Sequence, residues 1–344
     1  MSLQFIMGNS GSGKSYCLYD TVVREAIENP DKNYLVIVPE QFTMQTQKDL
    51  CLAHPKGGIM NIDVLSFGRL AYRVFEEVGQ DARVVLDDEG KNLVLRKIAG
   101  ECEKDLKVFK GNLKKQGYIS EVKSVLSEFA QYGVDFERLD DFMKEVPPES
   151  YLHYKLDDIR TIYEKFEEYL SEKYITKEEM LDVLSDAVPY SDILKGSVVA
   201  MDGFTGFTPV QNRLIGELFS VCEKVMITVT MDGRENPYVY EHPYQIFALG
   251  KQMVTSLMKI AGEKKTEIEE PICLFERPVY RFRDCSEMAF LETELFRYSG
   301  AKYNGSCESV SLHEVRSPGK EAKYVAESIR RLVRTKDTDT ETLP

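Results

Sequence analysis

The sequence contains no tryptophan, and no two of its seven cysteines are spaced C-x-x-C. That spacing is typical of zinc sites and redox motifs, and an odd number of cysteines does not suit a disulfide framework, so the pattern indicates reduced thiols. A cluster of cysteines that are distant in the sequence is left open. No apolar run approaches the ~20 residues of a membrane-spanning helix, and the N-terminus lacks the basic segment of a secretory signal. We therefore expect a cytoplasmic protein with no membrane partner.

Positive charge is in short supply. The 44 Lys and Arg residues are outnumbered by 57 Asp and Glu residues, which gives a formal net charge of −13 at pH 7. This balance argues against a simple basic coat for nucleic acids, although a narrow DNA groove depends on local charge rather than on the net charge. With 344 residues, of which 43% are hydrophobic, the chain is long enough for about two domains with a substantial core.

The first seventy residues alternate between strand and helix patterns. Leu3–Met7 and Asn33–Val38 are short and almost entirely apolar, as in strands that are covered on both faces of a sheet. A helix is predicted over Tyr16–Glu28, and a second helix and a third strand over Met44–Ala53 and Ile59–Leu65. This βαβαβ order predicts an α/β fold with a doubly wound parallel sheet.

The character of the sequence changes near Ser66. Apolar residues then recur at helical spacing, as at Ile119, Val122 and Leu126, and no convincing strand is found before residue 190. Strand patterns return at Ser197–Met201 and at Lys224–Thr230. We therefore expect a sheet domain made of two chain segments, an all-helical insertion, and the start of a following domain, at residues 1–75 with 190–285, 76–189, and 286–344.

The last part carries one strand pattern and one helix pattern. Val310 and Leu312 alternate within Ser309–Val315, and Lys320–Val333 places its apolar residues on one face of a helix. Because no further strand follows for this strand to pair with, we expect the sequence to stop at the beginning of another domain.

The segment between the first predicted strand and helix matches G-x-x-x-x-G-K-[ST], the P-loop pattern, at Gly8, Asn9, Ser10, Gly11, Ser12, Gly13, Lys14 and Ser15. The glycines allow the tight turn that points backbone N–H groups at a phosphate, and the helix N-terminus adds partial positive charge. The Lys14 ammonium suits the β- and γ-phosphates, and the Ser15 hydroxyl suits Mg²⁺. The alternative is a glycine-rich turn without a ligand. The context of strand, loop and helix favours nucleotide binding.

A P-loop requires a carboxylate that holds Mg²⁺ at the end of a nearby strand. Asp202 follows the apolar run Ser197–Met201 and is the candidate, while an Asp that merely ends a strand is the alternative. Helicase-type motors carry Glu at the next position, where it orients the attacking water, but this sequence has Gly203. We therefore assign no catalytic residue and predict little or no hydrolysis. Glu40 is an alternative water-activating carboxylate that the sequence leaves open.

The combination of these motifs resembles the first RecA-like domain of a superfamily-1 helicase. The resemblance rests on the P-loop, on Val38–Thr43, on Val64–Leu70, and on Met201–Phe204 followed by Gln211. In detail the pattern is similar to the AddB family, the helicase-like subunits of bacterial AddAB helicase–nucleases of the RecBCD type. The resemblance covers essentially this whole chain and only the N-terminal part of such a subunit.

The resemblance implies a partner, cofactors and a process. Members of this family pair with an AddA helicase–nuclease subunit, process DNA double-strand breaks for recombinational repair, and respond to a Chi sequence. It implies ATP and Mg²⁺ at this end of the chain. It places a nuclease and an iron–sulfur cluster in a C-terminal part that this sequence does not contain, so no residue here is assigned to either.

Superfamily-1 domains place the segments after the second and third strands on single-stranded DNA. By that resemblance the candidate DNA contacts in these two segments are polar, basic and aromatic side chains that suit phosphate contact and base stacking, namely Gln41, Thr43, Ser66, Phe67 and Arg69, with Tyr72 as a further candidate. Phe204 and Phe207, which follow Asp202, are added as candidates for base stacking. For the three phenylalanines, burial in the core is an even alternative.

Other features carry weaker expectations. A solvated helix face is favoured over duplex or single-stranded DNA contact for the basic stripe of Lys104, Lys107, Lys110, Lys114 and Lys115. Loop packing is favoured over adenine stacking for Tyr238, Tyr240 and Tyr244. The four histidines are scattered and suggest no metal site.

The function that these residues favour is binding of ATP·Mg²⁺ and single-stranded DNA with weak or no hydrolysis. A P-loop small-molecule kinase with a helical lid is the alternative enzyme. It is disfavoured because such lids are compact and rich in Arg, whereas the predicted insertion is long and carries mostly Lys, Glu and Asp. An interaction module whose P-loop only supports the fold is the third hypothesis.

Overall fold

The computed structural model describes residues 1–79, 83–113, 115–170 and 173–336, without the side chains of 116, 335 and 336. The chain divides into two compact units, Met1–Arg281 and Phe282–Pro344. Each unit is described separately below.

The first unit contains a seven-stranded sheet within the described residues, and each of its strand pairs is parallel. Its path runs β3-β2-β6-β7-β1-β8, and β9 also pairs with β1. The α/β class with a parallel sheet is therefore confirmed. The strands are β1 (Ser2–Gly8), β2 (Tyr34–Ile37), β3 (Ile62–Leu65), β6 (Val198–Met201), β7 (Lys224–Thr230), β8 (Glu267–Ile268) and β9 (Ile272–Leu274).

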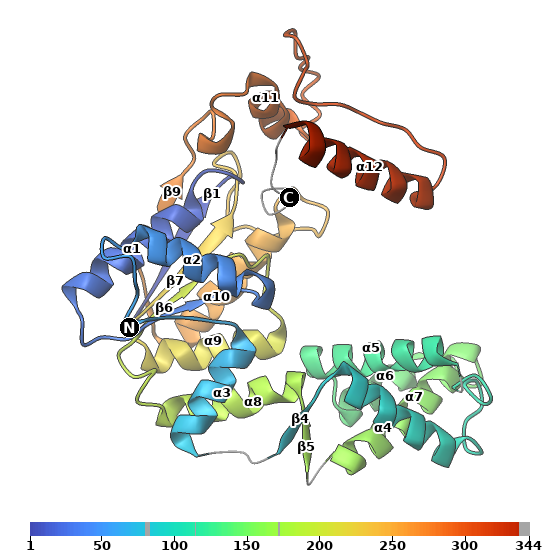
Figure 1. Ribbon diagram of the computed structural model, residues 1–344. Helices are drawn as coiled ribbons and strands as arrows, with labels where there is room; N and C mark the ends of the chain where they lie inside the picture. The colour runs from blue at the N-terminus through green and yellow to red at the C-terminus, as the bar shows by residue number, and fades with distance from the viewer. Residues whose placement is uncertain (80–82, 114, 171–172, 337–344) are drawn as a thin grey trace. The chain divides into compact units, whose positions relative to one another are not determined.

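The central strands bury both of their faces, which explains their continuous apolar sequences. In β2, Leu35 and Ile37 join one core while Tyr34 and Val36 join the other. The second core is completed by α1 (Lys14–Glu28) and α2 (Thr43–Ala53). The first core is covered by α3 (Phe67–Val78), α8 (Lys177–Ala187), α9 (Pro209–Val221) and α10 (Ala248–Lys264). Figure 1 shows these helices around the sheet.

The segment between α3 and α8 builds a hydrophobic core of its own. Ile119, Val122 and Leu126 belong to it, as their helical spacing predicts. The prediction of an all-helical insertion is wrong in one respect, because β4 (Val84–Leu86) and β5 (Tyr174–Thr176) pair in parallel at its two ends. Three residues carry too little pattern to reveal a strand. The helices of this segment are α4 (Asp88–Cys102), α5 (Gln116–Tyr132), α6 (Phe136–Glu145) and α7 (Tyr151–Leu170).

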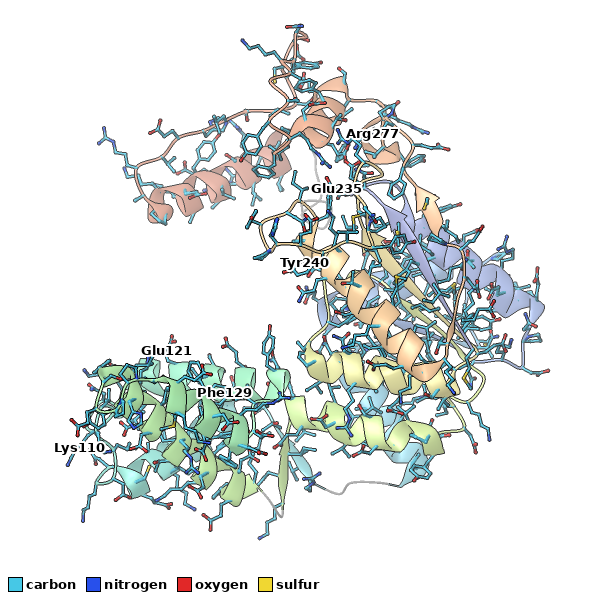
Figure 2. The ribbon with its side chains drawn as sticks, turned by 180° about the vertical axis from the view of Figure 1, so that it is seen from behind. Lys110, Glu121, Phe129, Glu235, Tyr240 and Arg277 are labelled. Atoms are coloured by element: carbon cyan, nitrogen blue, oxygen red, sulfur yellow. The ribbon has the colours of Figure 1, made fainter. Side chains whose placement is uncertain are left out.

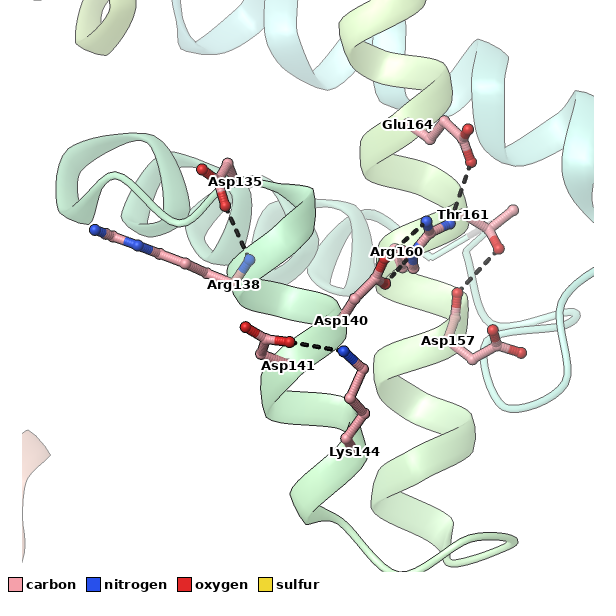
Figure 3. Close-up of polar contacts among 9 residues, drawn as sticks. All are labelled: Asp135, Arg138, Asp140, Asp141, Lys144, Asp157, Arg160, Thr161 and Glu164. Carbon is pink, nitrogen blue, oxygen red and sulfur yellow. Dashed lines mark hydrogen bonds and ion pairs between the residues drawn. The ribbon is translucent and has the colours of Figure 1, made fainter.

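Polar contacts fix the helices of this segment to one another. The guanidinium of Arg160 on α7 pairs with both carboxylate oxygens of Asp140 on α6, at 2.5 and 3.2 Å, as Figure 3 shows. The buried Asp158 accepts the backbone N–H groups of residues 107, 108 and 109, at 2.7–2.8 Å. The ammonium of Lys91 on α4 contacts Glu178 on α8 at 2.6 Å and is only 3% exposed. This ion pair joins the helical segment to a helix of the sheet layer.

The second unit contains α11 (Ser286–Glu294) and α12 (Pro318–Lys336). The strand predicted at Ser309–Val315 is not formed, because alternation alone does not make a strand without a neighbour to pair with. None of the hydrophobic side chains described in this unit is buried. Across the described part of the whole chain, no helix is both long and apolar enough to span a membrane.

Candidate functional site

The Gly8–Ser15 loop connects the carboxyl end of β1 to the first turn of α1. Gly11 and Gly13 have φ angles of 83° and 94°, in the left-handed region that only glycine adopts without cost. A Cβ at Gly8 would collide with the Ser12 Oγ and would lie 2.8 Å from the Leu274 carbonyl oxygen. Each of the three glycines is therefore required by the course of the chain.

Lys14 lies within the turn of this loop. Its ammonium donates hydrogen bonds to the carbonyl oxygens of Gly8 and Asn9, at 3.0 and 2.9 Å. Burial lowers the pKa of Lys14 to about 8, and the charge of Asp202 opposes that shift. The Ser12 Oγ is a buried side-chain oxygen without a hydrogen-bond partner among the described residues, whereas Ser15 is exposed at the second position of α1. The loop thus offers a cation and an unsatisfied hydroxyl at a helix N-terminus.

Asp202 follows β6 and lies at the same edge of the sheet as this loop. That placement follows from the parallel register, in which Met201 pairs with Ile227 on β7 while Gly8 pairs with Thr230. Asp202 is buried, and its two carboxylate oxygens accept hydrogen bonds from the hydroxyls of Tyr19, at 2.9 Å, and Thr228, at 2.5 Å.

Tyr19 and Thr228 were not identified from the sequence. Burial, and next the charge of Asp202, raise the pKa of the Tyr19 hydroxyl, so it remains a neutral donor. Hydroxyl residues at isolated positions of a helix and a strand give no local signal. These two hydroxyls hold the Asp202 carboxylate in place at the edge of the sheet.

Gly203 has a φ of 78°, so the position next to Asp202 favours glycine. A Cβ there would approach the Pro39 Cδ to 3.4 Å. A glutamate would therefore be strained at this position. Glu40, the other carboxylate considered, is exposed in the short 3₁₀ helix Glu40–Phe42 that follows β2.

Arg281 also lies beside the loop and was missed in the sequence. Its backbone N–H donates to the Gly11 carbonyl oxygen at 3.1 Å. Its side-chain carbons pass so close to Gly11 that a Cβ on that glycine would lie 2.7 Å from the Arg281 Cβ. The charge of Arg281 contributes to lowering the pKa of Lys14, although less than burial does. The two residues are over 260 positions apart, so no spacing rule links them.

The candidate DNA contacts divide into exposed and buried residues. Gln41 and Arg69 are exposed. Thr43 is buried, and its hydroxyl donates to the Glu40 carbonyl oxygen at 3.0 Å. Ser66 is buried as the N-cap of α3, where its hydroxyl accepts the Arg69 backbone N–H.

The three phenylalanines proposed as stacking faces pack on one another. Phe67 is 7% exposed and belongs to the core beneath the sheet. Its ring centroid lies 5.4 Å from that of Phe204 and 6.3 Å from that of Phe207, and both of these are partly buried. Phe67 therefore packs in the core, which was the alternative to base stacking.

The sequence matches a family model described as ADDB, N-terminal, over residues 5–292. The chain belongs to the AddB N-terminal family. The matched range includes the Gly8–Ser15 loop, Asp202 and Arg281, and it ends within α11.

Curated relatives are named as subunits of an ATP-dependent helicase/deoxyribonuclease. The protein of Lachnoclostridium phytofermentans is 41% identical over 341 residues, which cover 98% of this chain and 30% of the relative. Those of Thermoanaerobacter pseudethanolicus and Clostridium tetani are 35% and 32% identical over 336 residues, with 97% of this chain and 29% of each relative covered. The chain thus spans less than a third of the length of these AddB-family relatives.

Two lysines of the predicted basic stripe have partners in this AddB-family chain. The ammonium of Lys107 pairs with Asp157 at 2.9 Å and lies over the ring of Tyr154, and that of Lys115 lies over Tyr118. Lys110 is exposed on the helical segment, as Figure 2 shows, and Lys114 lies outside the described residues. Within the described ranges, no group of three His, Cys, Asp or Glu side chains is placed to hold a metal ion.

Proposed function

We propose that this AddB-family chain is the nucleotide-binding, helicase-like N-terminal part of a subunit that processes DNA double-strand breaks. It would bind ATP·Mg²⁺ and single-stranded DNA, pair with an AddA-like helicase–nuclease subunit, and support recombinational repair and Chi recognition. The names of its relatives support helicase and deoxyribonuclease activity for the whole assembly. The observation that carries the proposal is the shared sheet edge of the Gly8–Ser15 loop and Asp202.

The loop fits a nucleotide phosphate group. Its glycines allow backbone N–H groups to surround an oxyanion at the N-terminus of α1. The buried Ser12 hydroxyl, which has no hydrogen-bond partner among the described residues, could donate to a phosphate oxygen. Phosphate oxygens would replace the Gly8 and Asn9 carbonyls as partners of the Lys14 ammonium. Arg281 adds a second cation at Gly11. This arrangement resembles a P-loop in a RecA-like domain.

Mg²⁺ fits the same site in its donor chemistry. The metal prefers oxygen ligands, and the Ser15 hydroxyl and Asp202 carboxylate are the two candidates at this edge. Each carboxylate oxygen of Asp202 accepts one hydroxyl hydrogen bond and keeps further lone-pair capacity. When bound, the metal would neutralise phosphate charge.

Hydrolysis by this chain would be weak. Water must be deprotonated or oriented to attack the terminal phosphate, and glutamate does so in helicase motors. The backbone at Gly203 disfavours any side chain. A nucleotide bound here would therefore serve mainly to fix the conformation of the site.

Single-stranded DNA would contact the exposed polar side chains that follow β2 and β3. Gln41 and Arg69 are exposed there, whereas Thr43 and Ser66 are occupied with helix capping. Arg69 offers a cation for a phosphate, and a partly exposed Phe204 offers an aromatic edge.

The decisive experiment combines nucleotide and DNA titrations. Lys14→Ala should weaken binding of ATP at least ~10-fold because a charge-assisted contact with the phosphates is lost, while Lys259→Ala, an exposed lysine of α10, should leave it unchanged. For a single-stranded oligonucleotide, Arg69→Ala should lower the affinity. It should also reduce the slope of log K against log salt concentration by about 1, because one phosphate contact is lost. Arg73→Ala, on the same helix but paired with Asp63, is the control. Equal ATP affinity of wild type and Lys14→Ala would refute nucleotide binding at this loop.

A further inference from the structure

The segment Phe275–Arg281, which follows β9, is held in place through four of its residues. The Arg277 guanidinium donates to the Asp232 carboxylate at 2.7 Å. Val279 is 1% exposed. The Arg281 backbone N–H reaches the Gly11 carbonyl oxygen. Phe275 at its start packs so closely on Gly233 that a Cβ there would lie 2.9 Å from the Phe275 ring.

Asp232 is anchored to the other side of the same loop. It follows β7, and the backbone N–H of its neighbour Met231 donates to the Gly8 carbonyl oxygen at 2.9 Å. The Asp232 side chain is 3% exposed and also receives the guanidinium of Arg234 at 2.7 Å. Burial alone would raise the pKa of Asp232, but its hydrogen bonds with Arg234 and the charges of Arg277 and Arg234 outweigh it and hold the pKa well below the ordinary range. The carboxylate is therefore ionised at neutral pH.

These contacts form a closed path around the Gly8–Ser15 loop. Gly8 connects to Met231, Asp232 connects to Arg277, and Arg281 returns to Gly11. The nearby strands β8 and β9 have only two and three residues, so the hydrogen bonds of the sheet hold little of the chain next to this segment. The position of the segment therefore depends on these tertiary contacts. Arg277 is labelled in Figure 2, together with Glu235 of the Asp232 loop.

We propose that the Asp232–Arg277 ion pair is a positioning contact, which fixes the Phe275–Arg281 segment so that the Arg281 guanidinium stands beside the loop as a second cation for a nucleoside triphosphate. The inference rests on the proposed nucleotide binding and adds a specific residue pair to it. Arg277 touches no nucleotide in this scheme and acts through Arg281. Removal of the Arg277 side chain would break the ion pair with Asp232, so the segment that carries Arg281 would be held less firmly.

The structure supplies a matched control, because Arg234 pairs with the same carboxylate. Arg234 lies two residues from Asp232, on the loop that follows β7 and outside the Phe275–Arg281 segment. A purely structural role of the Asp232 cluster predicts similar effects of Arg234→Ala and Arg277→Ala. A positioning role predicts that only Arg277→Ala changes nucleotide binding.

The first experiment is a double-mutant cycle on the full chain, with ATP and ADP titrated in the presence of Mg²⁺. Arg281→Ala should weaken ATP binding ~10-fold, Arg277→Ala several-fold, and the double variant no more than Arg281→Ala, because coupled residues are not additive. Arg277→Lys should restore most of the affinity, and Arg234→Ala should match wild type. Additive losses, or equal losses for Arg234→Ala and Arg277→Ala, would overturn the positioning role.

The second experiment uses the absence of tryptophan from the sequence. Tyr280→Trp, at an exposed residue beside Arg281, places a single fluorescent reporter on the segment. We expect ATP to change its emission, and we expect Arg277→Ala to reduce that change at saturating ATP, where all sites are filled. An unchanged amplitude in Arg277→Ala at saturation would contradict the proposal. The failure of Lys14→Ala to weaken ATP binding would instead refute nucleotide binding itself, so the two failures are distinguishable.

Discussion

At the scale of single residues, burial changes the pKa of Lys14, a cation of the proposed nucleotide site. Burial lowers its pKa to about 8 from the ordinary value of 10.5. Between these two pH values the unfolded chain binds more protons at this residue than the folded chain does. The contribution of Lys14 to folding stability in the absence of nucleotide therefore rises with pH across this window.

Nucleotide binding should depend on pH in the opposite direction. A polyphosphate favours the protonated Lys14, so we expect ATP affinity to fall as the pH rises through 8, by at most ~10-fold per pH unit. Lys14→Arg keeps its charge throughout this range and should show a much flatter profile. Calorimetric titrations between pH 7 and about pH 9.5 measure both. Parallel profiles for the two proteins would show that another group titrates.

Gly203 provides a second test at this scale. An L residue in the left-handed region costs about 1–2 kcal/mol, so Gly203→Ala should lower the free energy of unfolding by roughly that amount. Gly206→Ala is the matched control in the same loop, because φ is not positive there and a Cβ meets nothing within 4 Å. Urea denaturation compares the two. Equal stability of both variants would remove the argument that the backbone excludes a water-activating side chain.

At the scale of elements, one buried carboxylate holds a loop of the helical segment. Asp158 on α7 accepts three backbone N–H groups from residues 107–109. Asp158→Ala leaves these buried donors unsatisfied and should destabilise the protein by on the order of 3 kcal/mol or more. Asp157→Ala removes only a surface pair with Lys107 and should cost less than ~1 kcal/mol. Thermal unfolding compares the variants, and similar losses for both would contradict the role of Asp158.

The same elements show what the sequence could and could not predict. The glycine-rich motif and the apolar runs located β1, the loop, α1 and the central strands, because burial on both faces leaves a continuous apolar pattern. The strands β4 and β5 were missed because three residues carry little pattern, and Ser309–Val315 was overpredicted because its alternation has no partner strand. Each error concerns pairing, which is a property of two segments rather than one.

The candidate site follows the same division. The loop residues and Asp202 could be named because each follows a recognisable strand. The fold brings three further residues to the site from distant positions in the sequence, namely Arg281, Tyr19 and Thr228. No local spacing in the sequence identifies them. Buried Thr43 and Ser66 show the converse, since polar residues after a strand also serve as helix caps.

At the scale of the whole molecule, the two units differ in their cores. The first unit holds all of the buried hydrophobic side chains described, the last of them Val279, and the second unit holds none. Buried apolar area is what offsets the entropy of ordering a chain. We therefore expect amides of α11 and α12 to exchange with deuterium orders of magnitude faster than those of β1, β7 and α9. Comparable protection in α12 and β7, measured by mass spectrometry, would contradict this.

The pairing of β4 with β5 has a consequence for how this chain could be altered. Two parallel neighbours cannot be closed by a tight turn and need a return path of a dozen or more residues. The region from 87 to 173 is therefore an enlarged return path between adjacent strands, and its attachment points are side by side. A designer could exchange it for one short helix, provided that Glu178 on α8, which would lose its ion pair with Lys91, were replaced as well.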